Sequence, residues 1–246
     1  MSKPVVVLDP GHGGVDPGAV AHGLREKDLN LELALKTAEM LDGVKVLLTR
    51  ERDIFVSLAD RVALSRRAAP NLFLSLHANA GGGRGFESFI ASSAGARDPA
   101  VTMQRAVHNA VMIALNRWEI VDRGEKRANF FVLRHNPHPA VLIESLFIDN
   151  AREAQIWREP LFVETLAAGV ARGIREALGL PPDRETAEKA PGGPVTGTTG
   201  EYARLPNSTL FSVQVGAFAL IENARQRLAE AQKAGFNDAF IYRKQF

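Results

Sequence analysis

Short runs of apolar residues recur along the first 150 residues, and turn-forming or polar residues follow each of them. A run of this length is too short for a typical helix and is characteristic of a strand buried inside a sheet. The predicted strands are residues 5–8, 44–48, 72–76, 86–90, 130–133 and 141–143.

Longer stretches in which apolar residues recur with helical spacing separate these runs. The predicted helices are residues 29–41, a stretch beginning at residue 58, residues 99–118 and residues 160–178. Ser57 followed by Asp60 is a capping box that marks the start of the second helix. Because strands and helices alternate, the sequence predicts an α/β fold in which helices cover both faces of a sheet.

The pattern changes after residue 178. Residues 179–209 are rich in proline, glycine and threonine, and they hold too little apolar surface to offset the entropy of ordering, so we expect a linker. Residues 210–246 regain a pattern of strand, helix and strand, but such a short βαβ piece is smaller than most domains that fold alone. The predicted organisation is therefore a main domain at 1–178, a linker at 179–209 and a C-terminal piece at 210–246.

The chain of 246 residues contains no cysteine, so any metal site must be built from His, Asp and Glu. The net charge is only +2 and the basic residues are scattered, so a nucleic-acid partner is not expected. The chain shows neither a signal peptide nor an apolar stretch long enough to span a bilayer, so we expect no membrane insertion. We also expect a monomer.

Two histidines occupy matching places at the ends of predicted strands. His12 lies in a glycine-rich turn directly after the first strand, and His77 ends the apolar run that forms the third. In an open α/β sheet, ligands and catalytic groups gather where strands give way to loops at their carboxyl ends. The two imidazoles can therefore meet in space although they are far apart in the sequence.

Two glutamates could complete a catalytic site with these histidines, because open zinc sites commonly combine two His with one Glu. Glu26 lies in the loop before the first predicted helix and is a candidate third ligand. The alternative is that Glu26 and Asp28 only favour the helix N-terminus electrostatically. Glu144 ends a buried run and is a candidate general base, and the alternative is a structural ion pair with Arg134 or a lysine.

The remaining histidines are weaker candidates. His22 and His108 lack the strand-end placement, and His108 falls within a helical pattern typical of a surface or core residue. His135 and His138 flank a loop before the last predicted strand, so one of them could line a cleft. Arg134 could bind a substrate carboxylate or form a structural ion pair.

Four separated blocks resemble, in the same order, the motifs of the zinc-dependent N-acetylmuramoyl-L-alanine amidases, a family of bacterial autolysins and phage endolysins. The blocks are Leu8-Asp-Pro-Gly-His-Gly-Gly with Asp16-Pro-Gly-Ala, Glu26-Lys-Asp with Asn30, Ser75-Leu-His-Ala-Asn79, and Val141-Leu-Ile-Glu144 with Phe147 and Asn150. The resemblance covers residues 4–178 and implies a twisted, mainly parallel six-stranded sheet. It also implies that His12, Glu26 and His77 bind one Zn²⁺ and that Glu144 is the catalytic glutamate.

The function that the resemblance implies is hydrolysis of the amide between N-acetylmuramic acid and L-alanine in peptidoglycan, at the bacterial cell wall. A chain without a visible leader would reach the wall by leaderless release or as a mature fragment. Two other classes of function stay open, namely a zinc carboxypeptidase-like peptidase and a non-catalytic peptidoglycan-binding protein.

The C-terminal piece resembles half of a SPOR domain, a peptidoglycan-binding module, through Phe211-Ser-Val-Gln-Val-Gly-Ala-Phe. Such domains have two halves, and this chain shows only the first, so the prediction is a partial module. Some exported amidases of the family carry a helix that plugs the site, inserted before the catalytic glutamate. Residues 81–129 hold one predicted strand and one long helical pattern, so we expect no plug and an enzyme that is active on its own.

Overall fold

The computed structural model describes residues 3–159 and 161–181. Most of the predicted linker and the whole SPOR-like segment at 210–246 lie outside these residues. The strands of the main sheet are, in chain order, β1 Val5–Pro10, β4 Lys45–Leu48, β5 Leu72–Asn79, β6 Phe86–Ala91, β7 Asp122–Ala128 and β8 Ala140–Phe147. A separate short ribbon pairs β2 Val20–Ala21 with β3 Leu24–Arg25.

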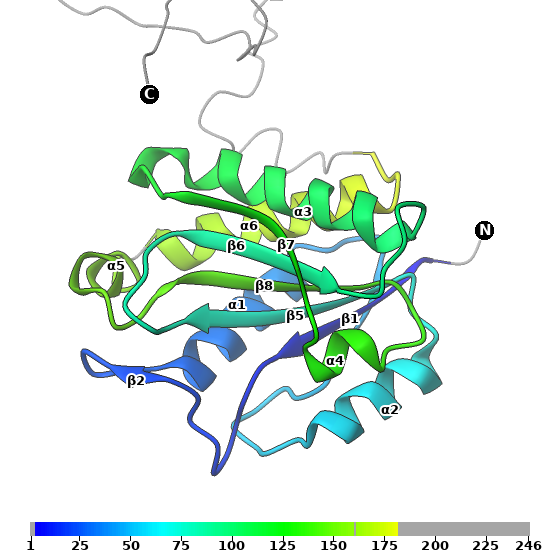
Figure 1. Cartoon of the computed structure of the whole chain (residues 1–246), viewed down its shortest axis with the longest axis horizontal. Helices are drawn as coiled ribbons and strands as arrows, with labels where there is room; N and C mark the ends of the chain where they lie inside the picture. Colours follow the sequence, from blue (N-terminus) through cyan, green and yellow to red (C-terminus); the bar gives the residue numbers. More distant parts are fainter. Residues whose placement is uncertain (1–2, 160, 182–246) are drawn as a thin grey trace, which may run out of the picture. The chain divides into compact units, whose positions relative to one another are not determined.

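The main sheet has the strand order β4-β1-β5-β8-β6-β7. Figure 1 labels five of these strands, from β1 to β7 in that order. Its first four strands are parallel to one another, and β6 runs antiparallel to β8 but parallel to β7. The predicted α/β fold with a mainly parallel six-stranded sheet is thus confirmed. The carboxyl ends of β1, β5 and β8 lie at one edge of the sheet, where His12 follows β1, and where His77 and Glu144 lie in the carboxyl-terminal halves of β5 and β8.

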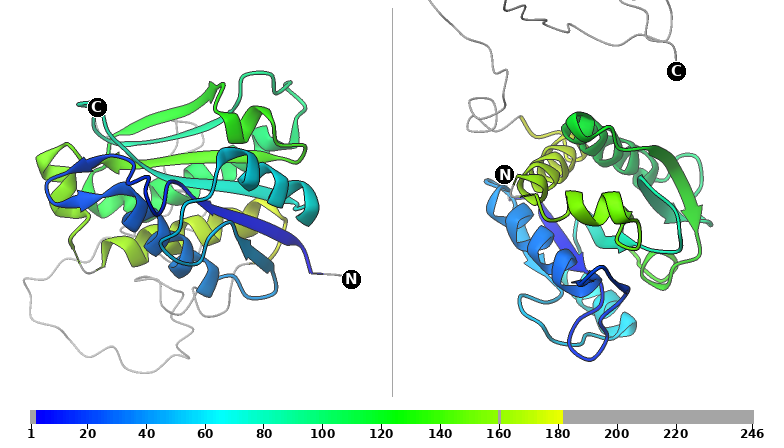
Figure 2. Two further views of the ribbon diagram at one scale, coloured as in Figure 1. Left: turned by 90° about the horizontal axis from the view of Figure 1, so that it is seen from below. Right: turned by 90° about the vertical axis from the view of Figure 1, so that its left-hand side faces the viewer.

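Helices cover both faces of this sheet, as predicted (Figure 2). The helical elements are α1 Glu26–Glu39, α2 Leu58–Ala68, α3 Pro99–Ala114, the 3₁₀ helix η1 Leu115–Trp118, α4 Phe131–Arg134, α5 Ala151–Ile156 and α6 Phe162–Ala177. The larger apolar core lies between the sheet and α1, α3 and α6, and a smaller one lies under α2 and α4. Within the described residues, no helix is long and apolar enough to cross a membrane.

The helix signals in the sequence are largely confirmed. The Ser57 hydroxyl accepts a hydrogen bond from the Asp60 N–H at 3.1 Å and so caps α2. α3 begins at Pro99 as expected, but it ends at Ala114 and continues as the 3₁₀ helix η1 to residue 118. The placement of Glu26 in a loop was wrong, because this residue is the first of α1.

The sixth strand was predicted in the wrong place. Residues 130–133, expected as a strand, largely form α4, and Val132 and Leu133 bury their side chains in the smaller core. The true strand is β7, whose sequence Asp-Arg-Gly-Glu-Lys-Arg-Ala has no apolar run. β7 is an edge strand that pairs only with β6, and a solvated edge strand commonly carries charged side chains.

The alternation of side chains along each strand decides which face carries the site. In β5, Phe73 belongs to the smaller core under α2 and α4, and His77 lies an even number of residues further on. Leu142 and Glu144 have the same relation in β8. His77 and Glu144 therefore lie on the face of α2 and α4. The long helix within residues 81–129 is α3, which packs with α6 on the other face.

Candidate metal centre

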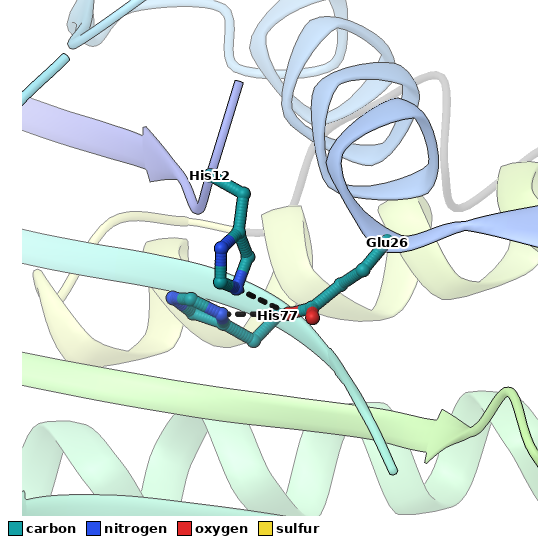
Figure 3. A group of neighbouring side chains, drawn as sticks. All are labelled: His12, Glu26 and His77. Carbon is teal, nitrogen blue, oxygen red and sulfur yellow. Dashed lines mark hydrogen bonds and ion pairs between the residues drawn. The ribbon is translucent and has the colours of Figure 1, made fainter. Parts of the chain in front are cut away.

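Three side chains from separate elements converge at the carboxyl edge of the sheet (Figure 3). His12 comes from the turn after β1, His77 from β5 and Glu26 from the first residue of α1. The Oε1 atom of Glu26 lies 3.1 Å from Nε2 of His12 and 2.8 Å from Nδ1 of His77. The three candidate ligand atoms lie within 4.8 Å of one another, so they can reach a single ion.

In His12 and Glu26, the atom that does not face the other candidate ligands is held by a neighbouring group. The Asp16 carboxylate lies 2.9 Å from Nδ1 of His12, which leaves Nε2 to face Glu26. The Oε2 atom of Glu26 accepts the Ala19 N–H at 2.9 Å, which leaves Oε1 to face the histidines. A carboxylate behind a ligating imidazole is the usual arrangement in metal sites, because it sets the tautomer and the ring orientation.

The carboxylates of the cluster raise the pKa of both histidines and so favour their protonated forms. Burial lowers the pKa of the His12 imidazole, but the carboxylates of Glu26 and Asp16 outweigh it and raise that pKa to about 9. Burial likewise opposes the charged form of His77, and the Glu26 hydrogen bond raises its pKa. Burial raises the pKa of Glu26, yet the two histidines bring it well below its usual range. A metal cation would displace these protons and take over their role.

Two glycines make room for the cluster. A side chain at Gly11 would place its Cβ 2.1 Å from Cε1 of His77, so the imidazole packs directly on the backbone there. A Cβ at Gly18 would lie 2.6 Å from Oε2 of Glu26, and Gly18 also has a φ of +63°, which other residues adopt at a cost. Both positions therefore require glycine for local reasons that belong to the site.

Two buried arginines hold the turn that carries His12. Arg50 donates to the carbonyls of Pro10 and Gly11 at 3.0 and 2.9 Å. Arg61, from α2, donates to the carbonyls of Pro10 and His12, both at 2.7 Å. His12 itself has a φ of +62°, a conformation that is uncommon outside glycine and needs support from the surroundings.

The charge of Arg61 is matched by a carboxylate inside the sheet. Its Nη1 lies 2.6 Å from Asp9, which is 1% exposed. The same carboxylate accepts hydrogen bonds from the hydroxyls of Thr49 and Ser75, at 2.6 and 2.7 Å. This buried network ties β1 and β5 to α2 directly beneath His12.

Glu144 stands beside the cluster on the same face of the sheet. It pairs in register with His77 on one neighbouring strand and with Glu87 on the other. Burial and the nearby carboxylates of Glu26 and Glu87 raise the pKa of Glu144 to about 7, although the imidazole of His77 opposes the shift. A carboxyl group with such a pKa can exchange a proton near neutral pH.

The other predicted candidates lie elsewhere. His22 is exposed, with Nε2 3.3 Å from the Asp149 carbonyl. His108 is buried, and its ring nitrogens lie 2.9 Å from the Ser88 hydroxyl and 2.9 Å from the Asp122 carboxylate. Arg134 donates to the His135 ring at 3.0 Å.

Sequence reasoning assigned no role to the residues that support the candidate ligands, namely Asp16, Arg50, Arg61, Asp9 and Ala19. One signal could have revealed part of this network. Asp9 interrupts a buried apolar strand, and a buried carboxylate needs a partner. Its partners come from distant positions with no local pattern, so their identity follows only from the fold.

Comparison with known proteins places this chain in a family. Residues 6–176 match the family model described as N-acetylmuramoyl-L-alanine amidase. The chain is 38% identical over 240 residues to the sporulation-specific N-acetylmuramoyl-L-alanine amidase of Bacillus subtilis (strain 168), which covers 96% of this chain and 84% of that protein. It is also 42% identical over 184 residues to the endolysin of Bacillus phage SPP1, across 73% of this chain and 68% of the endolysin.

The fold agrees with the sequence comparison. The structure of an N-acetylmuramoyl-L-alanine amidase from Clostridium difficile 630 superposes with a TM-score of 0.68 and 30% identity, covering 73% of this chain and 98% of that one. The chain belongs to the N-acetylmuramoyl-L-alanine amidase family. It is an amidase and a peptidoglycan hydrolase, as predicted, and the peptidase and non-catalytic alternatives are set aside.

Proposed function

We propose that this amidase works with one Zn²⁺ held by His12, Glu26 and His77. The observation that carries the proposal is the convergence of two imidazole nitrogens and one carboxylate oxygen within 4.8 Å at the open edge of the sheet. This donor set suits zinc, and catalytic zinc sites with two His and one Glu keep a further position for water or substrate. A bound Zn²⁺ supplies Lewis acidity, which activates water near neutral pH and polarises the scissile carbonyl.

The chain's own residues then have separate tasks. Glu144 accepts the proton of the attacking water and passes it to the amine of L-alanine as the amide bond breaks. Its raised pKa, about 7, suits both steps because the group can accept and release a proton near neutral pH. Asp16 keeps His12 oriented through Nδ1, and Arg50 and Arg61 keep the turn of His12 in place.

The remaining parts of the proposal concern the wall. The main domain at 1–178 acts on peptidoglycan at the bacterial cell wall, and residues 210–246, joined by the linker 179–209, form a partial SPOR-like segment that binds it. The support is the resemblance of the sequence to the amidase family and to the SPOR domain. The alignment with the Bacillus subtilis amidase adds to it, because that alignment spans 240 residues and so extends beyond the main domain. A monomeric state stays a prediction.

The test measures the release of new L-alanine amino termini from purified peptidoglycan. Wild type, protein stripped of metal, stripped protein given Zn²⁺, and the variant Glu144→Gln are compared. The matched control is Glu164→Gln, which removes an exposed carboxylate on α6 that pairs only loosely with Lys36, at 3.5 Å.

We expect release by wild type and by the control, loss on chelation, and recovery with zinc. Glu144→Gln should lose at least about 100-fold in rate, because proton transfer by a positioned group contributes roughly that much. Metal-loaded Glu144→Gln that cleaves at the wild-type rate would refute the role of Glu144. Full activity of thoroughly chelated protein would refute the role of the metal.

A further inference from the structure

A second charged cluster lies on the site face, on β6 and β7, the two strands that follow the strand of Glu144 in the sheet. Glu87 on β6 is the register partner of Glu144, and its side chain is 7% exposed. Its carboxylate accepts hydrogen bonds from Asn79 at 2.7 Å, from Arg123 at 2.8 Å and from Lys126. His77, Glu144, Glu87 and this basic pair thus form a row across β5, β8, β6 and β7.

The backbone of β7 aims Arg123 into this row. Between the register pairs Phe86↔Asp122 and Ser88↔Glu125, β6 has one residue and β7 has two. This is a β-bulge, with Gly124 at a φ of +84°, and bulges commonly re-aim a side chain next to a functional site. The Arg123 guanidinium lies over the Phe147 ring at 4.9 Å, so a second contact holds it in place.

The charges of the cluster do not cancel. Two cations meet one carboxylate, and the cations are 32% and 38% exposed whereas Glu87 is buried. Glu125 lies between Arg123 and Lys126 in the sequence, but it pairs with Arg105 of α3 at 3.5 Å. Asp122 is engaged with His108 and with the Gly124 N–H. One positive charge therefore remains toward solvent on the face of the site.

The position of this charge matches the substrate of the proposed reaction. Neighbouring strands lie about 4.8 Å apart, so β7 lies roughly 10 Å from β8. An extended peptide advances about 3.3–3.6 Å per residue, so about three residues span that distance. In the amide between N-acetylmuramic acid and L-alanine, the peptide begins at the scissile bond. The charge therefore falls beside the second or third residue of the stem peptide.

We propose that Arg123 and Lys126, held by Glu87, bind a carboxylate of the stem peptide two to three residues from the scissile amide. This inference rests on the proposed amidase reaction and assigns the peptide, rather than the glycan, to the β6–β7 side of the site. Arg123 offers a planar fork suited to a carboxylate, and Lys126 adds a point charge. Arg123 and Lys126 are thus specificity residues, and Glu87 and Asn79 position them.

The test uses soluble muramoyl tripeptides that differ only in whether the carboxylates of the second and third residues are free or amidated. Wild type, Arg123→Gln and Lys126→Gln are compared by kcat and KM, and thermal melting checks that each variant is folded. The matched control is Arg127→Gln, because Arg127 is a cation of the same strand that lies on the opposite face and donates to the Ala94 carbonyl. Arg123→Lys keeps the charge without the fork, and Lys126→Gln leaves Glu87 paired should Arg123→Gln fail to fold.

We expect wild type to prefer a free carboxylate by about tenfold in kcat/KM, mainly through KM, since a charge-assisted hydrogen bond at a partly exposed site is worth about that factor. Arg123→Gln and Lys126→Gln should abolish most of this preference, because they lose more activity on the substrate with free carboxylates than on the amidated one. Equal cleavage of free and amidated substrates by wild type would overturn the inference, and so would variants that lose the same factor on both. Failure of zinc-loaded wild type to cleave any muramoyl peptide or peptidoglycan would overturn the proposed function, and this inference with it.

Discussion

Two basic side chains bind the turn that carries His12, and two others lie on the edge strand β7, but the two pairs act in opposite ways. Arg50 and Arg61 are buried, and their guanidinium groups donate to main-chain carbonyls of the turn. Arg123 and Lys126 are partly exposed, and they share one carboxylate. The first pair fixes a backbone conformation, whereas the second leaves charge available to a ligand.

The difference follows from the separate tasks of the two regions, the turn of His12 and the strand β7. Ligand atoms around a metal need fixed positions, and a buried network in a low dielectric supplies them because every donor has an acceptor. Recognition of a flexible peptide tolerates movement, and a solvated edge strand suits it. Mutations in the two regions should therefore differ in kind, with loss of stability at the turn and loss of selectivity at β7.

The largest effect is expected from Arg61→Met. This change leaves the Asp9 carboxylate buried without its cation and removes the donors to the carbonyls of Pro10 and His12. Breaking a buried ion pair from one side costs about 3–5 kcal/mol, so the free energy of unfolding should fall by that amount. Denaturant unfolding of the metal-free protein measures it.

A double variant and a surface variant complete this test. Asp9→Asn combined with Arg61→Met removes both charges and should recover part of the loss. Arg172→Met breaks only the exposed pair with Glu176 on α6 and should change stability by less than about 0.5 kcal/mol. Equal losses for Arg61→Met and Arg172→Met would mean that the buried network does not hold the turn.

The second effect concerns zinc affinity and again separates the two regions. Asp16→Ala removes the carboxylate behind Nδ1 of His12, so the ring loses its fixed orientation. Loss of such a partner typically weakens metal binding by about 10–100-fold, and competition with a chromogenic chelator measures the change. Asp98→Asn, at the cap of α3, and Arg123→Gln should leave zinc affinity within about twofold of wild type. An unchanged affinity of Asp16→Ala would show that the turn alone orients His12.

The sequence was sufficient to predict the parts of the molecule that depend on local pattern. The strands β1, β5 and β8 have apolar runs because both of their faces are buried, and the motif residues at their ends could be located from those runs. The convergence of His12 and His77 followed from the rule that site residues gather at the carboxyl ends of strands.

The parts that failed depend on contacts between distant residues. β7 is polar because only one of its edges is paired, so no periodicity distinguished it from a loop, and the apolar residues of α4 were read as the missing strand. Arg61 is 52 positions from Asp9, and no local signal joins them. The role of the β7 cations likewise depends on a bulge that only the strand register reveals.

The smallest effect is a change in stability, not in activity, and it is expected at Glu144. This residue lies between the two regions and faces His77 and Glu26 on one side and Glu87 on the other. Burial and these carboxylates raise the pKa of Glu144 from 4.5 to about 7 in the folded, metal-free protein. Between those two pH values the native state binds more protons than the unfolded state, so the free energy of unfolding falls as the pH rises through this window. Glutamine does not titrate. At pH 8 the free energy of unfolding of metal-free Glu144→Gln should therefore exceed that of wild type by on the order of 1 kcal/mol after solvent screening, and at pH 4 the two values should nearly match. If the difference in free energy of unfolding between variant and wild type is the same at both pH values, the neighbours of Glu144 do not hold it in a protonated form. Glu144 would then be an ordinary carboxylate, despite its place between the candidate metal ligands and the basic pair of β7.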